Sequence, residues 1–280
     1  MPTVLVRNSY GKSRVRLTKV QRHADRHDLF EWSIDVTLTG DFAAAYTAGD
    51  NRHVVATDTM KNIIYAMAAD TELGSPEEFA TILGRHFLNS YPQVESATIA
   101  IEVEPWERIV SDDVPDMHAF VGGGSRHRTC RVEQSRQGRK IVAGLADLML
   151  LKTTDSAFRD FHRDEYRTLP DIDDRIFATS VTAEWTYTGE THWDDAYVAI
   201  RQALVESFAV HKSLGVQHTL HEMGATVLAY CQAIEEITLT MPNRHRLPVN
   251  LEPLGRKNAN EIFVATDEPY GVISGTMRRR

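Results

Sequence analysis

The chain has 280 residues, of which 42% are hydrophobic and 25% are charged, a balance typical of a globular protein that buries its core without needing disulfides or metals. A formal net charge of −8 argues against general nucleic-acid binding, which requires a basic surface. The two cysteines lack CxxC spacing, no apolar run reaches 18 residues and the N-terminus has no signal-peptide core, so we expect a reduced cytoplasmic protein without a membrane partner.

The first half of the chain predicts one α+β unit. Apolar residues alternate with polar residues over 30–38, as in an antiparallel strand with one face toward the core and one toward water. Helical spacing follows over 60–67. It returns after the sequence SPEE at 75–78, which is typical of a capping box with proline at the first helical position. A further alternating strand covers 99–103.

The second half predicts the same order of elements. Strand, helix, helix and strand patterns occur in turn at 181–187, 193–208, 220–228 and 237–241. Between the halves, 111–140 contains the loosest stretches, and we expect the boundary there, with units at 1–135 and 136–280. The repeated order predicts a duplicated α+β unit with helices on one face of an antiparallel sheet.

Residues 148–175 carry the most informative pattern of the chain. Twelve positions in these 28 residues have the types and gaps of the signature of the urate oxidase (uricase) family: Leu148, Leu150, Leu151, Lys152, Thr153, Thr154, Ser156, Phe158, Phe161, Tyr166, Leu169 and Arg175. Four other segments resemble the same family, namely 10–16, 54–62, 216–219 and 242–245. Because five separated segments agree, the chain is identified by this resemblance as a member of that family.

The resemblance implies a fold and an assembly. Uricases have the tunnelling fold (T-fold), in which two tandem units per chain join those of other subunits in a β-barrel tunnel. A homotetramer with active sites at its subunit interfaces is therefore expected. The polar face of the strand at 30–38 is consistent with a sheet that meets water in a tunnel.

The resemblance also implies a binding site for urate, a planar purine trione that is anionic at neutral pH. The implied substrate-binding residues are Thr57, Asp58, Phe158, Leu169, Arg175, Val216, Gln217 and Asn243. Each type suits the ligand: an aromatic ring stacks on a purine, a guanidinium donates two parallel bonds to one edge, and an amide donates and accepts at the other. Backbone N–H groups at Asp58 and Val216 would complete the cage, and a helix start near 57–58 would add a positive dipole end.

The catalytic residues implied by the resemblance are Lys12, Thr57 and His245, a proton relay, with Asn243 holding dioxygen and later water above the ring. A lysine acts as a base only if its pKa falls, and desolvation and the nearby Arg175 would both act in that direction. The expected products are 5-hydroxyisourate and hydrogen peroxide. No metal or organic cofactor is implied, because urate itself is the electron donor.

Two other interpretations remain open. The chain could be another T-fold enzyme acting on a purine or pterin, commonly with zinc held by His and Cys, or a non-catalytic purine-binding relative. The pairs His23/His27 and His218/His221 lack the third converging ligand that a zinc site needs. The sequence also departs from the family at Arg244, where lysine is common. Pro248, in the strand expected after His245, predicts an edge strand or a bulge there.

Overall fold

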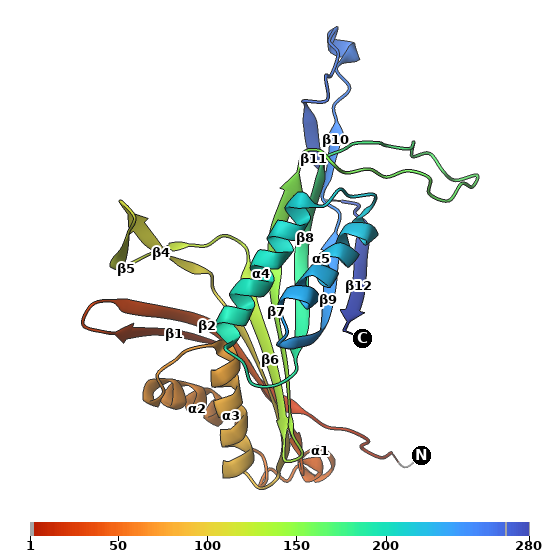
Figure 1. The fold of residues 1–280 in the computed structure, drawn as a ribbon. Coiled ribbons are helices and arrows are strands. Elements are labelled where there is room, and N and C mark those ends of the chain that lie inside the picture. Colours follow the sequence, from red (N-terminus) through yellow and green to blue (C-terminus); the bar gives the residue numbers. More distant parts are fainter. Residues whose placement is uncertain (1–2, 267, 280) are drawn as a thin grey trace. The chain divides into compact units, whose positions relative to one another are not determined.

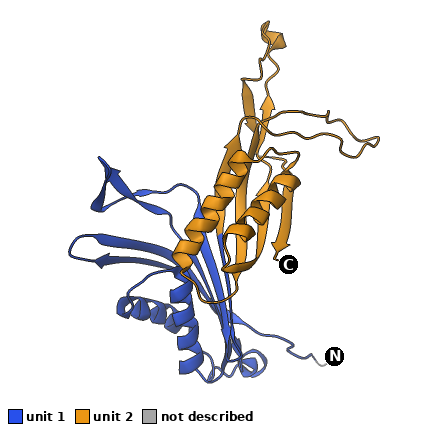
Figure 2. Cartoon of the chain, viewed as in Figure 1, with its two compact units in different colours: residues 1–144 blue, residues 145–280 orange. Residues whose placement is uncertain are grey.

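The computed structural model describes residues 3–266 and 268–279 and has an α+β fold with antiparallel sheets and few helices (Figure 1). Its internal contacts divide the chain into two compact units, residues 1–144 and 145–280 (Figure 2). The division lies inside strand β7 (Arg139–Lys152), which runs continuously across it.

The first unit is built on four antiparallel strands in the order β1-β2-β3-β6. These are β1 (Tyr10–Arg22), β2 (His27–Gly40), β3 (Val94–Val103) and β6 (His127–Ser135). The predicted alternation of β2 is confirmed, since Trp32, Ile34, Val36 and Leu38 are all buried while their neighbours in the chain are more exposed. The apolar face of this strand therefore forms the centre of the first core.

Three helices complete the first unit: α1 (Ala43–Ala48), α2 (Thr57–Asp70) and α3 (Pro76–Ser90). Helix α2 packs on β1, and α3 packs on β3 and β6. The predicted start of α3 is confirmed, because the Ser75 hydroxyl accepts a hydrogen bond from the Glu78 N–H at 3.2 Å and Pro76 opens the helix.

The stretch 111–128, expected to be loose, is largely a hairpin. Strands β4 (Trp106–Ser111) and β5 (Val114–Gly122) pair with each other, and Asp112 and Asp113 turn the chain with φ of 51° and 61°. Most residues of both strands are exposed, so neither strand needs the apolar–polar alternation that reveals a half-buried strand in a sequence.

The second unit has strands in the order β7-β8-β9-β12 and two helices. The elements after β7 are β8 (Phe177–Tyr187), α4 (Trp193–Val210), α5 (Val216–Tyr230), β9 (Ile234–Pro242) and β12 (Val272–Arg278). Helices α4 and α5 lie on the same face of these strands (Figure 1), and α5 packs on β9 and β12. None of the helices in the described chain is long and apolar enough to cross a membrane.

A short two-stranded sheet follows β9. It pairs β10 (His245–Pro248) with β11 (Phe263–Thr266), and the 3-10 turn Glu252–Leu254 lies between them. Strand β10 has β11 as its only partner in this sheet and ends at Pro248. The proline therefore ends a short edge strand, as the sequence predicts.

Candidate active site

A short segment after β7 organises the second unit's candidate site. The Asp155 carbonyl accepts a hydrogen bond from the Ser213 N–H, and the Ala157 N–H donates to the Ser213 carbonyl, both at 2.8 Å. Ser213 is buried and lies in the loop that leads into α5. These two bonds therefore fix the start of α5 against the segment 152–158, which we call the signature segment.

The same segment positions the ring and the guanidinium named by the sequence. The Arg175 N–H donates to the Ser156 carbonyl at 2.8 Å. Phe158 and Ile172 exchange two backbone hydrogen bonds of 2.8 and 2.9 Å. These backbone bonds thus place Arg175 and Phe158 at the base of the long loop between β7 and β8.

Arg175 is half-buried and lies next to Phe158. Its guanidinium carbon is 5.3 Å from the centre of the Phe158 ring, and burial lowers the pKa of Arg175. The Arg175 Nε is buried and has no hydrogen-bond partner among the described residues. A buried N–H of a charged group is costly without an acceptor, so this arrangement favours binding of an anion.

Gln217 approaches the same ring. It lies in the first turn of α5, whose N-cap residue, Gly215, provides no side-chain cap. A Cβ at Gly215 would be 3.7 Å from both the Gln217 Oε1 and the Phe158 Cδ2. The amide and the ring therefore border one small gap, beside the uncapped N–H groups of Val216 and its neighbours.

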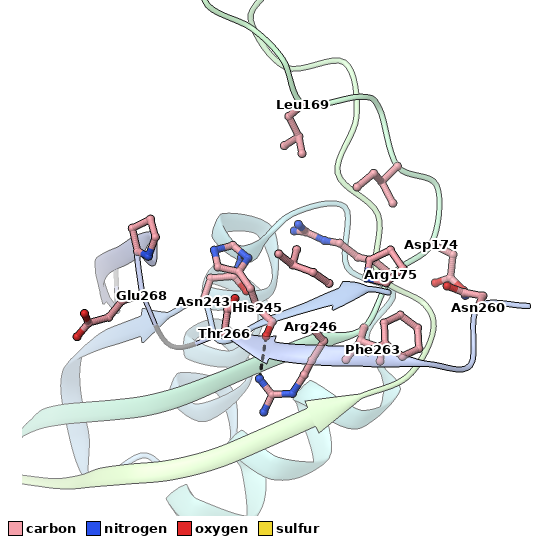
Figure 3. A pocket seen from close by; sticks show the side chains of 15 residues that line it. Leu169, Asp174, Arg175, Asn243, His245, Arg246, Asn260, Phe263, Thr266 and Glu268 are labelled. Carbon is pink, nitrogen blue, oxygen red and sulfur yellow. Dashed lines mark hydrogen bonds between the residues drawn. The ribbon is translucent and has the colours of Figure 1, made fainter. Parts of the chain in front are cut away.

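A cavity of about 580 Å³ in the second unit collects four predicted residues, Leu169, Arg175, Asn243 and His245 (Figure 3). The Asn243 Nδ2 is 3.4 Å from the His245 Nδ1. The Asn243 N–H donates to the Gly271 carbonyl at 2.8 Å.

The cavity wall also includes residues that the sequence analysis missed. Phe263 and Thr266 of β11, Asn260 and Glu268 line it. They belong to no motif that was recognised, and β11 is too short to show a periodic pattern.

The first unit carries Lys12, Thr57 and Asp58. The Tyr10 hydroxyl accepts a hydrogen bond from the Val55 N–H at 2.8 Å, which ties the first two family-like segments together. A Cβ at Gly11 would lie 1.8 Å from the Val36 carbonyl oxygen, so only glycine fits beside Lys12. A β-bulge after Lys12, between Lys12 and Val15, then redirects β1.

Thr57 is the first residue of α2, and the N-cap position belongs to Ala56, which makes no side-chain cap. Thr57 therefore does not cap α2. Neither Thr57 nor Lys12 makes a side-chain hydrogen bond to another described residue, so both groups remain available to a ligand. The first-turn N–H groups of α2 are likewise uncapped by a side chain.

Asp58 is held by its own helix. Its carboxylate accepts hydrogen bonds from the Lys61 ammonium and, at 3.0 Å, from the Asn62 amide. The bond from Lys61 is the largest cause that lowers the pKa of Asp58, and Lys12 contributes a smaller Coulombic effect in the same direction. Lys12 therefore lies within electrostatic range of Asp58, at the start of α2.

No group of three or more His, Cys, Asp or Glu side chains in the described part of the chain is arranged to hold a metal ion. His218, His221 and Glu222 lie on α5 as predicted, but they do not converge with a further ligand. Among the residues that the structure describes, these side chains therefore lack the further ligands that a zinc centre needs.

Comparisons with known proteins agree on one family. A family model described as uricase matches residues 8–133 and 141–274. A uricase of Arthrobacter globiformis is 44% identical over 277 residues, 99% of this chain and 90% of the relative. A uricase of Arabidopsis thaliana is 37% identical over 292 residues, 96% of this chain and 94% of the relative. The crystal structure of uricase from Arthrobacter globiformis matches with a TM-score of 0.95 at 43% identity, covering 100% of this chain and 96% of that one.

Proposed function

Because the chain belongs to the uricase family, we propose that it is a urate oxidase, which uses dioxygen and water to convert urate into 5-hydroxyisourate and hydrogen peroxide. The observation that supports this function most directly is the buried Nε of Arg175 beside the Phe158 ring, which has no hydrogen-bond partner in the described part of the chain. A flat anion that stacks on the ring would place its acceptor atoms on this guanidinium.

The second unit would hold the purine. Phe161 stacks on Phe158 with ring centres 4.6 Å apart and an interplanar angle of 11°, so urate would use the opposite face of Phe158. Arg175 would bind one edge of the purine. Gln217 and the Val216 N–H would bind the other, since an amide offers both a donor and an acceptor. Leu169 would form an apolar wall.

The first unit would supply the proton chemistry. The α2 N-terminus, with the Thr57 hydroxyl and the Asp58 N–H, would bind an anionic edge of urate. Lys12 would take a proton from bound urate through Thr57, and His245 would continue the relay. Such general-base assistance contributes about 10²- to 10⁴-fold to a rate.

The oxidation balances without another redox partner. Two electrons and two protons leave urate for dioxygen, which becomes hydrogen peroxide, and the oxygen of one water becomes the hydroxyl group of the product. Asn243 would hold dioxygen, and then that water, above the ring. Urate supplies both electrons, so the proposed reaction needs no metal or organic cofactor.

The proposed assembly is a homotetramer of T-fold chains with units 1–135 and 136–280. The two compact units and their shared order of strands, helices and strands support the tandem arrangement. Each site would combine Lys12, Thr57 and Asp58 of one chain with the second-unit residues of a neighbour. The two buried free cysteines, Cys130 and Cys231, support a reducing compartment such as the cytoplasm.

The test is direct. Purified protein in air should remove the ultraviolet absorbance of urate, consume oxygen and produce peroxide in equal amounts, with or without a chelator. Absence of turnover in air would contradict the proposed activity and would favour a non-catalytic purine-binding protein. Turnover that the chelator abolishes, together with a stoichiometric bound metal, would favour a metal-dependent enzyme of the same fold.

A further inference from the structure

We propose that Lys152 is a positioning residue for urate binding, because it ties the end of α4 and the loop 211–215 to the signature segment and so fixes Gln217 relative to Phe158 and Arg175. This inference rests on the proposed function. Lys152 touches neither the reacting atoms nor the cavity residues, and its effect on the substrate would pass through the backbone that it holds.

Lys152 is the last residue of β7, and its ammonium reaches across to the end of α4. It donates to the Phe208 carbonyl at 3.5 Å and to the His211 carbonyl, and it lies 5.5 Å from the centre of the Phe208 ring. The last carbonyls of a helix lack partners within the helix and carry partial negative charge. A half-buried cation at this place therefore fixes where α4 ends and where the following loop begins.

Hydrogen bonds hold the loop after α4 in place between the Lys152 contact and the first turn of α5. The buried Ser213 is clamped by the backbone of the signature segment. Its hydroxyl donates to the Gly215 carbonyl at 3.2 Å, and the Thr219 N–H donates to the same carbonyl at 3.2 Å. A displacement of His211 would therefore pass through Ser213 to Gly215 and to the first turn of α5.

The signature segment also holds the other two binding groups. Its Ser156 carbonyl accepts from the Arg175 N–H, and Phe158 is its last residue. Lys152 thus joins the two backbone stretches that position Phe158, Arg175 and Gln217. A misplacement of about 1 Å in such a wall can cost up to about 100-fold in rate.

The first unit contains the same device, but the loop that it fixes does not lead to a substrate residue. From β1, the Lys19 ammonium donates to the Ala68 and Thr71 carbonyls at the end of α2, both at 2.6 Å. The loop that follows is clamped through Leu73, whose N–H and carbonyl both bond to the Gln21 amide.

The helix reached by this loop, α3, carries no predicted substrate residue. Its first turn instead holds Glu77, which is buried and ion-paired with Arg128 at 2.7 Å. Lys19 is therefore a matched control: it binds the end of a helix in the same way, but the loop that it fixes leads to a helix without a proposed purine contact.

The experiment compares Lys152→Met and Lys19→Met with the parent enzyme. Three quantities are measured for each: kcat and KM in air, the Kd for urate under anaerobic conditions, and the thermal midpoint. We expect Lys152→Met to raise KM and the anaerobic Kd about tenfold, with kcat within about threefold of the parent. Lys19→Met should lower the thermal midpoint about as much as Lys152→Met does, while its KM and Kd stay at the parent values.

Two further variants keep the test decisive. Lys152→Arg retains a cation with several donors and should restore KM to within about threefold of the parent. If Lys152→Met does not fold, Lys152→Gln, which keeps a donor but loses the charge, should raise KM several-fold.

Parent-like KM and Kd in a folded Lys152→Met or Lys152→Gln variant would overturn the inference, as would an equal rise in Lys19→Met. A parent enzyme that binds no urate under anaerobic conditions would instead contradict the proposed function.

Discussion

The guanidinium carbon of Arg175 lies 5.3 Å from the centre of the Phe158 ring, and both residues are anchored to the same three residues of backbone. Arg175 donates its N–H to Ser156, and Phe158 lies two positions further along the chain. The ionic anchor and the stacking surface therefore move together. Substitutions at the two positions should have non-additive effects, because residues in contact share their environment.

The first prediction concerns the shape of the Arg175 side chain. Arg175→Lys keeps the positive charge but loses the planar fork, so it should raise the KM for urate about 10- to 100-fold with a smaller effect on kcat. Initial rates over a range of urate concentrations give both constants. Arg159→Lys is the matched control, since Arg159 belongs to the same loop, is exposed and pairs with Asp173 at the surface. An unchanged KM in Arg175→Lys would remove Arg175 from the binding site.

The second prediction tests the division of the site between neighbouring chains. Lys12→Ala and Arg175→Ala chains should each be inactive alone. After mixing and reassembly in equal amounts, about a quarter of interface sites would combine an unsubstituted Lys12 with an unsubstituted Arg175, so about a quarter of the parent activity should return. The control is reassembly of the doubly substituted chain with itself. Mixed oligomers without activity would show that one chain supplies both residues.

The third prediction separates proton transfer from binding. Lys12→Met should lower kcat by about 10²- to 10⁴-fold while the anaerobic Kd for urate changes much less, because a general base contributes mainly in the transition state. Arg16→Met is a suitable control: Arg16 is an exposed cation on the same strand and pairs with Glu104 at 3.1 Å. If Lys12→Met weakened urate binding as strongly as it lowered kcat, Lys12 would be a binding residue instead of a base.

Much of the core could be predicted from the sequence because local patterns record burial. The alternation that buries Trp32 and Ile34 is visible without any structure, and so is the cap at Ser75. The residue types of the stretch 148–175 also indicate a stacking ring and a guanidinium. In each case, the residues that must have a particular type, whether apolar, capping or aromatic, are close together in the chain.

Other features depend on contacts that no local pattern records. The hairpin β4–β5 is mostly exposed, so its strands show no alternation. Lys152 contacts the carbonyl of His211, 59 residues away, and no local sequence pattern at either residue predicts that contact. Phe263 and Thr266 line the cavity because β11 pairs with β10, in which His245 lies opposite Thr266. Such tertiary relationships require the coordinates.

The last prediction concerns pH and the loop that Lys152 holds. Burial is the largest cause that lowers the pKa of His211, and the neighbouring His218 and Lys152 act in the same direction while Glu222 opposes them. The His211 and His218 rings are 4.5 Å apart, and the His211 Nε2 is buried without a partner among the described residues. A proton added at His211 would therefore meet two neighbouring basic groups and would find no acceptor at Nε2.

The sign of the effect on stability follows from this lowered pKa. Below the ordinary histidine value of about 6.5 the unfolded chain binds a proton more readily than the folded chain, so acid favours unfolding. The contribution of His211 is constant above that pH, and stability is lost as pH falls from there through the folded pKa. His211→Asn should therefore show a smaller fall in thermal midpoint between pH 7.5 and pH 5 than the parent, whatever its midpoint at pH 7.5. Parallel curves for the two proteins would show that His211 does not carry this acid sensitivity.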